Sequence, residues 1–209
     1  MVRLERTTPS RGFSHMKKST IALLFLSSTI MIRPQGTTSS TDPFLNIIPV
    51  RDGGLLLLSN RDLTDQEYLE GVERIKNPTT VNIIRLSGNK LKNINPKYFN
   101  RFKNLKQLYL NNNQIVHIAD ESLLGLPLEV FDVSYNKIMQ IGDKTISRCS
   151  ELKELNLAYN NIKIIESQAL DCKNLKRVNI TGNPITEKPS AVKKLKELLP
   201  RQIVLLSKE

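Results

Sequence analysis

Five asparagine side chains recur at a fixed spacing along the middle of this 209-residue chain. Successive members of the series are 23 or 24 residues apart, and the series consists of Asn89, Asn113, Asn136, Asn160 and Asn183. An asparagine amide both donates and accepts hydrogen bonds, so its chemistry is the pairing of backbone groups. A buried backbone group without a partner costs about 1–3 kcal/mol. The spacing therefore predicts a ladder in which each amide satisfies a turn and ties one repeat to the next.

Few other side chains have types that could do covalent or metal chemistry. The chain has two histidines, and neither has companions: His15 lies near the N-terminus and His117 stands alone. A zinc site needs more ligands than these, so we expect no bound metal. No serine–histidine–aspartate arrangement, glycine-rich phosphate loop or pair of catalytic carboxylates stands out. We therefore expect neither an enzyme nor a cofactor.

The two cysteines, Cys149 and Cys172, each lie three residues before a leucine, Leu152 and Leu175, that occupies the same repeat position. One interpretation is a pair of small buried hydrophobic residues. The alternative is a disulfide between them, which would require export from the cell. Neighbouring strands lie about 4.8 Å apart, and the Cα atoms of a disulfide are about 4.4–6.8 Å apart. The spacing is compatible with both interpretations.

The asparagines belong to a longer pattern that must position them. Five segments share the template apolar-x-x-apolar-x-apolar-x-x-Asn-x-apolar: VNIIRLSGNKL (81–91), LKQLYLNNNQI (105–115), LEVFDVSYNKI (128–138), LKELNLAYNNI (152–162) and LKRVNITGNPI (175–185). Apolar residues at alternate positions predict a short strand with one buried face. A fixed period of this length predicts a solenoid, in which each repeat is stabilised by its neighbours.

These segments resemble the typical 23–24-residue class of leucine-rich repeat, which continues after the asparagine with further spaced apolar residues such as Ile138, Ile141 and Ile146. The resemblance implies an α/β solenoid: a short right-handed horseshoe with a parallel concave β-sheet and helical N- and C-terminal caps. Members of this class are commonly secreted proteins or receptor ectodomains that bind other proteins. The resemblance thus implies a protein partner of unknown identity.

Strand residues that point away from the core would line the concave face. Tyrosine and arginine are enriched in binding hot spots, and this face mixes them with acidic and amide side chains. We expect the partner to contact Arg85, Tyr109, Asp132, Tyr135, Glu154, Asn156, Tyr159 and Arg177. A stripe of lysines, Lys106, Lys153 and Lys176, is interrupted by Glu129. Asn179 begins an N-glycosylation sequon within a predicted strand.

The segments outside the repeats differ from them in composition. Residues 1–32 predict a signal peptide, with Met16 as an alternative start, because a basic beginning precedes a short apolar run. That run is too short for a stable membrane span unless it is retained as a signal anchor; a mitochondrial presequence is a further alternative. Residues 33–45 predict a linker, 46–80 a degenerate first repeat with a helix, 81–186 the five repeats and 187–209 a C-terminal cap.

Charge bears on the class of partner. The formal net charge is +11, but residues 1–40 alone contribute +5. The remainder is only mildly basic, which disfavours a nucleic-acid ligand. We expect a non-enzymatic protein-recognition module that is secreted or surface-exposed. The alternatives are an intracellular adaptor or assembly factor, or a regulator of an enzyme.

Overall fold

The structure is a computed structural model, and it describes residue 44 and residues 47–50, 53–147, 149–199 and 204–207. The predicted leader (1–32) and the predicted linker (33–45), apart from Phe44, lie outside the described residues. In the part of the chain that is described, no helix is long and apolar enough to cross a membrane.

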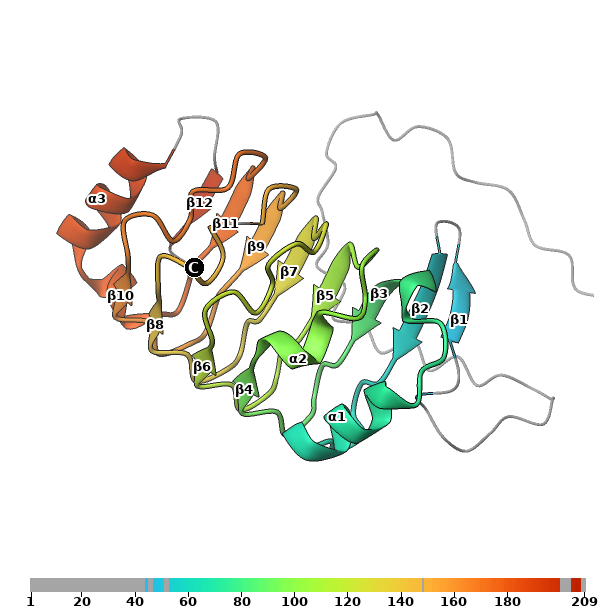
Figure 1. Cartoon of the computed structure of the whole chain (residues 1–209). Helices are drawn as coiled ribbons and strands as arrows, with labels where there is room; N and C mark the ends of the chain where they lie inside the picture. Colours follow the sequence, from blue (N-terminus) through green and yellow to red (C-terminus); the bar gives the residue numbers. More distant parts are fainter. Residues whose placement is uncertain (1–43, 45–46, 51–52, 148, 200–203, 208–209) are drawn as a thin grey trace, which may run out of the picture. The chain divides into compact units, whose positions relative to one another are not determined.

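One sheet of eight strands runs through the repeats (Figure 1). Seven of the strands are parallel, and each repeat contributes one of them next to the strand of the preceding repeat. In spatial order the strands are β1 (Ile47–Val50), β2 (Gly53–Leu57), β3 (Val81–Arg85), β5 (Gln107–Tyr109), β7 (Val130–Asp132), β9 (Glu154–Asn156), β11 (Arg177–Asn179) and β12 (Val204–Leu206). The predicted α/β solenoid is confirmed.

The first strand departs from the repeat pattern. Strand β1 pairs antiparallel with β2, so the sheet begins with a hairpin that the repeat template did not predict. The repeat period begins only after it, and β1 is therefore specified by its pairing with β2 and by no repeat motif.

Short elements return the chain from each strand to the next. Four two-residue strands form two parallel pairs, β4 with β6 and β8 with β10. The returning elements are η2 (Pro78–Thr80), β4 (Asn93–Ile94), α2 (Pro96–Phe99), β6 (His117–Ile118), β8 (Gln140–Ile141), β10 (Ile164–Ile165) and η3 (Pro184–Glu187). They keep each return short, as a repeat of 23 or 24 residues requires.

The core lies between the sheet and these returning segments. In β5, β7, β9 and β11 the central residue is buried and the residues on either side are half-buried. The central residues form one continuous layer across the repeats: Ile84, Leu108, Phe131, Leu155 and Val178. Each buried aliphatic side chain contributes about 1.5–3 kcal/mol relative to exposure, so stacked layers of this kind stabilise the repeats jointly.

Two longer helices lie in the segments before and after the repeats. Helix α1 (Asp65–Glu73) begins with a capping box in which Thr64 accepts from the Glu67 backbone N–H and the Glu67 carboxylate accepts from the Thr64 backbone N–H. Helix α3 (Pro189–Leu198) buries Leu195, whereas Leu198 is 47% exposed. The helix ends there, and Leu199 is buried in its place.

Candidate functional site

The ladder asparagines bridge successive repeats. Asn136 Oδ1 accepts from the Ile115 backbone N–H at 2.9 Å. Its Nδ2 donates to the carbonyl of Leu110 in the preceding repeat at 3.0 Å and to that of Val133 in its own repeat at 3.0 Å. Asn113, Asn160 and Asn183 make the equivalent three contacts. Each amide thus fixes the turn that follows one strand against the turn of its neighbour.

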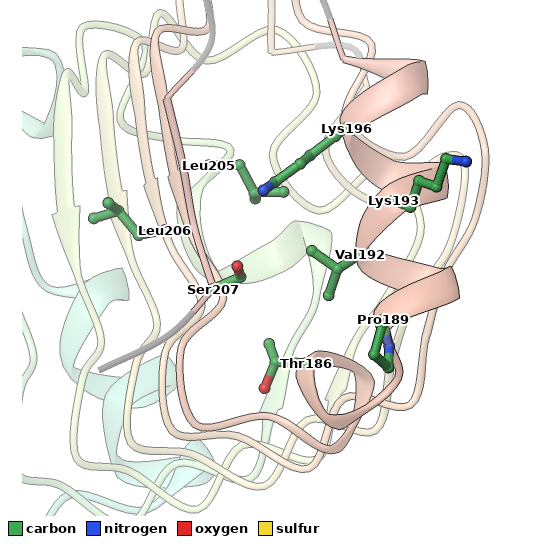
Figure 2. A pocket seen from close by; sticks show the side chains of 8 residues that line it. All are labelled: Thr186, Pro189, Val192, Lys193, Lys196, Leu205, Leu206 and Ser207. Carbon is green, nitrogen blue, oxygen red and sulfur yellow. The ribbon is translucent and has the colours of Figure 1, made fainter.

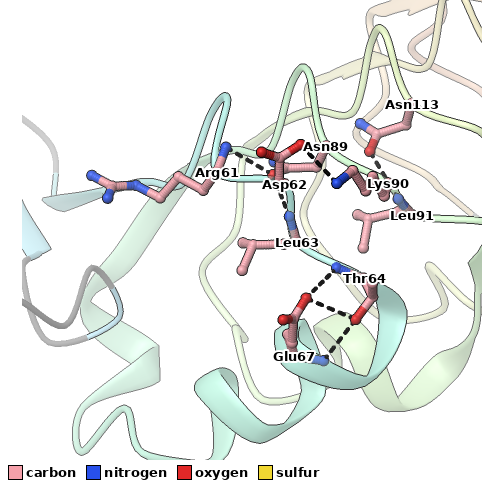
Figure 3. Close-up of polar contacts among 9 residues, drawn as sticks. All are labelled: Arg61, Asp62, Leu63, Thr64, Glu67, Asn89, Lys90, Leu91 and Asn113. Atoms are coloured by element: carbon pink, nitrogen blue, oxygen red, sulfur yellow. Dashed lines mark hydrogen bonds and ion pairs between the residues drawn. The ribbon is translucent and has the colours of Figure 1, made fainter.

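Asn89 extends the ladder to the degenerate first repeat (Figure 3). Its Oδ1 accepts from the backbone N–H groups of Arg61 and Leu63 at 3.1 and 3.0 Å, and its Nδ2 donates to the Leu58 carbonyl at 2.8 Å. Arg61 occupies the position where later repeats have asparagine. The backbone of the first unit is therefore hydrogen-bonded by Asn89, but this unit has no ladder asparagine of its own. That position is at the end of the ladder, where no further bridge is needed.

A second set of side chains lies on the side of the sheet opposite to the core layer. We call this side the open face and define it by two columns of residues in register. One column runs from β3 to β11 as Arg85, Tyr109, Asp132, Asn156 and Asn179. The other runs from β5 to β11 as Gln107, Val130, Glu154 and Arg177. Six of the eight residues predicted to contact a partner lie in these columns.

Charges on the open face are mostly neutralised by neighbours. The Arg85 guanidinium carbon lies 5.2 Å from the centre of the Tyr109 ring, and Arg177 Nη1 lies 3.0 Å from Glu154 Oε1. Asp132 Oδ1 accepts from the backbone N–H and the hydroxyl of Ser134 at 2.9 and 2.7 Å. Burial raises the pKa of the Tyr109 phenol, with nearby Arg85 opposing the shift, so Tyr109 presents a neutral hydroxyl at neutral pH.

The lysine stripe beside the sheet is partly neutralised in the same way. Glu129, which interrupts it, lies 2.5 Å from Lys153 Nζ and 3.8 Å from Lys106 Nζ. The hydrogen bond from Lys153 holds the pKa of the Glu129 carboxyl below its usual value. The interruption is therefore an ion-pair cluster, in which one carboxylate offsets part of the positive charge of this edge.

The remaining two predicted contact residues, Tyr135 and Tyr159, form a stacked aromatic pair beside the open face. Their ring centres are 4.5 Å apart and their planes differ by 16°. The side chains remain 51% and 37% exposed. Stacking of exposed aromatic rings leaves a rigid apolar surface with little rotamer entropy to lose on binding, which is the composition of a binding hot spot.

The backbone at these two tyrosines is strained. Tyr135 and Tyr159 have backbone φ angles of 53° and 54°. These values lie in the left-handed region, which residues other than glycine and asparagine rarely adopt. The same repeat position is Gly88, Asn112 and Gly182 in the other three copies, all with positive φ. The turn requires this conformation, and two repeats meet the requirement with a residue poorly suited to it, at a cost of about 1–2 kcal/mol each.

Gly182 limits the stack to two rings. A Cβ atom placed on Gly182 would lie 2.6 Å from Cδ1 of Tyr159, so the glycine backbone lies directly under that ring. The ring of Tyr159 is therefore held between Tyr135 and Gly182. The aromatic surface is thus limited to two adjacent repeats, with Asn112 at the equivalent position on one side and Gly182 on the other.

The comparisons with known proteins agree with this geometry. A family model described as "Leucine rich repeat" matches residues 79–138 and 127–185. The chain belongs to the leucine-rich repeat family. Leucine-rich repeat domains are generally protein-interaction modules. A search of the curated proteins finds no match.

Two solved structures show the same fold. One is the TLR13–ssRNA13 complex, with 24% identity and a TM-score of 0.61 over 75% of this chain and 21% of that one. The other is a leucine-rich repeat protein of Leptospira interrogans, with 23% identity and a TM-score of 0.54 over 61% of this chain and 31% of that one. This leucine-rich repeat chain spans about a fifth and about a third of those two chains, and the likeness establishes the fold alone.

In this leucine-rich repeat protein the two cysteines are buried free thiols. The Cys149 thiol lies 3.9 Å from the Leu123 carbonyl oxygen, and the Cys172 thiol lies 3.3 Å from that of Ile146. Whether the two thiols pair stays a prediction for experiment. The sequon residue Asn179 lies on the open face, where its Oδ1 accepts from the Thr181 backbone N–H at 3.1 Å. Among the described residues no cluster of His, Cys, Asp and Glu side chains is placed to hold a metal ion.

Burial determines the expected reactivity of these thiols. It raises the pKa of Cys149 to about 12 and that of Cys172 to about 11, the latter with a contribution from Asp171. Because the thiolate is the reactive form, we expect a disulfide-exchange reagent at pH 8 to modify the folded protein on the order of 100-fold more slowly than the denatured protein. The absorbance of the thiolate that the reagent releases measures the rates for the folded and the denatured protein. Rapid modification of the folded chain would contradict the burial, and denatured protein that reacts only after reduction would show that a disulfide forms.

Proposed function

We propose that this chain is a non-enzymatic recognition module that binds a protein partner through the open face, with the Tyr135–Tyr159 pair as the principal contact. The observation that carries the proposal is the retention of two strained tyrosines where the other repeats have glycine or asparagine. The turn needs positive φ but not a tyrosine, and a residue held in a conformation that does not suit it is typical of functional positions. The pair is also exposed and rigid.

The rest of the open face suits a protein surface. Its charges are paired or hydrogen-bonded, so docking does not bury uncompensated ions. Seven parallel strands at a spacing of about 4.8 Å extend over about 29 Å, enough for a standard interface of about 800 Å² per partner. A rigid sheet needs little ordering on binding, which favours affinity.

Replacing both tyrosines with asparagine tests the proposal directly. Asparagine adopts the left-handed conformation with less strain, so we expect the double variant Tyr135→Asn/Tyr159→Asn to be as stable as the wild type or more stable. Binding is expected to fall more than tenfold, because hot-spot truncations cost about 2 kcal/mol or more. The opposite signs for stability and affinity separate a contact role from a structural one.

The measurement compares the proteins captured from nuclease-treated extract by wild-type and variant chains, followed by titration of the purified partner. Nuclease treatment excludes bridging by RNA, which matters because one similar structure is an RNA complex. Lys163→Ala changes an exposed residue three positions after the ladder residue Asn160 and serves as the matched control. It is expected to change neither stability nor partner affinity. Equal partner affinity of the double variant would refute the proposal.

We further propose that the partner is met outside the cell, after removal of the leader. The support is the basic and then apolar composition of residues 16–32. Sequencing the N-terminus of the protein isolated from its source cells is expected to find a start between residues 33 and 42. Recovery of a chain that begins at Met1 or Met16 would instead favour an intracellular adaptor or an enzyme regulator with the same recognition face.

A further inference from the structure

A groove lies between helix α3 and the last strand of the sheet (Figure 2). Its volume is about 670 Å³. Pro189, Val192 and Leu205 line it together with Lys193 and Lys196. The Lys196 side chain reaches across toward Leu205, whereas the Lys193 amino group points to the outer side of the helix (Figure 2). The groove is at the opposite end of the repeats from α1 and is distinct from the Tyr135–Tyr159 pair.

Strand β12 forms one side of the groove and is an edge strand. It pairs with β11 on one side, and no described strand lies on the other. The Val204 backbone N–H donates to the Lys176 carbonyl, and the Leu206 carbonyl accepts from the Ile180 N–H, each at 2.8 Å. Since alternate residues of a strand direct their backbone groups to opposite sides, the N–H and C=O of Leu205 point to the unpaired edge. An edge of this kind is a template for pairing with another chain.

Apolar side chains flank this edge on the open face as well. Val204 is 52% exposed and Leu206 is 38% exposed. In the interior strands the matching positions are mostly polar, with Arg177 beside Val204 and Asn179 beside Leu206. The end of the sheet therefore combines unpaired backbone groups with unusually apolar side chains, which together favour an added extended segment.

Charge selects the kind of segment. The Lys193 side chain is 80% exposed, and its Nζ lies 4.0 Å from Glu197 Oε1. Lys188, Lys194 and Lys196 are exposed on the same helix or at its start. Residues 187–209 carry a formal charge of +3. A second copy of this chain would bring the same positive charge to the edge, and the repulsion disfavours it. A partner with carboxylates is attracted instead.

We propose that β12 accepts an extended peptide segment of another protein, rich in aliphatic and acidic residues, as an additional parallel or antiparallel strand. Its backbone pairs with Leu205, its aliphatic side chains cover the groove and the exposed Leu206, and its carboxylates approach Lys193 and Lys196. This second contact goes beyond the open-face function, because it uses the end of the sheet and could hold a partner whether or not the tyrosine pair is engaged.

The test selects binders from a displayed library of random nine-residue peptides with the full chain as bait. We expect enrichment of peptides that contain both aliphatic and acidic residues. The best peptide, labelled with a fluorophore, is then titrated against the wild type, against Lys193→Glu/Lys196→Glu, and against the control Lys97→Glu/Lys103→Glu, two exposed lysines in a different repeat. The groove variant is expected to bind at least about tenfold more weakly, because two reversed charges replace attraction of the peptide carboxylates with repulsion. The control is expected to bind as well as the wild type.

A second peptide distinguishes strand addition from simple charge attraction. The same sequence with alternate backbone nitrogens methylated, in either of the two registers, keeps its charges but cannot donate the ladder hydrogen bonds in one of them. One register is expected to lose at least about tenfold in affinity and the other little. Equal binding of both methylated peptides, equal binding by the groove variant, or enrichment without acidic residues would overturn the proposal. A concentration-dependent dimer abolished by Lys193→Glu/Lys196→Glu would overturn it in favour of a second copy.

Discussion

The Asn136→Ala variant is expected to lose about 3–5 kcal/mol of unfolding free energy. The side chain is 8% exposed and contacts four backbone groups: the Ile115 N–H and the carbonyls of Leu110, Val133 and Ser134. Alanine leaves the buried Ile115 N–H without this partner, which costs about 1–3 kcal/mol, and removes one of the two amide donors to each of the Leu110 and Val133 carbonyls, at about 0.5–1.5 kcal/mol per hydrogen bond. For a domain of this size the loss corresponds to a fall in Tm of about 10 °C.

Denaturant unfolding followed by circular dichroism measures the change. Asn161→Ala is the matched control, because Asn161 is an exposed asparagine next to the ladder residue Asn160. The control is expected to change stability by less than about 0.5 kcal/mol. The substitution Asn136→Asp keeps the acceptor for Ile115 but removes the two donors, so its expected loss of stability is also large. An Asn136→Ala midpoint equal to that of the control would show that the amide does not hold adjacent repeats together.

The repeat spacing was sufficient to predict this part of the structure. The position of each asparagine, and the two faces of β5, β7, β9 and β11, follow from periodicity alone because every copy repeats the same local constraint. The match between Leu108, Phe131 and Leu155 across three strands is the direct result of a nearly constant period. Each position of the template occurs five times in the same environment, so five residues together indicate whether that position is buried or exposed.

Features that occur once, or that depend on contacts between repeats, were not predicted. Strand β1 lies outside the period, and the groove beside β12 depends on how α3 packs next to the last strand. The stacking of Tyr135 on Tyr159 needs both the repeat register and the left-handed turn. The sequence did carry a sign of that turn, because Gly88, Asn112 and Gly182 occupy the same position and all favour positive φ.

The ion pairs around Glu129 illustrate a different kind of feature that the sequence could not predict. The lysine stripe was identified residue by residue, but its electrostatic character depends on side-chain distances that a sequence does not contain. Lys153 is close enough to Glu129 to form a hydrogen bond, and Lys106 is at the outer limit of an ion pair. Exposed pairs of this kind contribute only about 0.2–1 kcal/mol to stability, so their main effect is to change the surface that a partner meets.

The core layer offers the second large effect, through Phe131→Ala. Phe131 is fully buried at the centre of β7, between Leu108 of β5 and Leu155 of β9. Removing its ring leaves a cavity shared by three repeats, and large-to-small changes of a buried phenylalanine cost about 3–5 kcal/mol. Because stability in a solenoid is carried by contacts between neighbouring repeats, we expect amide hydrogen exchange to accelerate most in β5, β7 and β9 and least in β2 and β3.

Val130→Ala, on the open face of the same strand, is the control and is expected to cost less than about 1 kcal/mol. A uniform increase in exchange over all repeats would show that the solenoid unfolds as a single unit, whereas an unchanged midpoint for Phe131→Ala would contradict the position of the core itself.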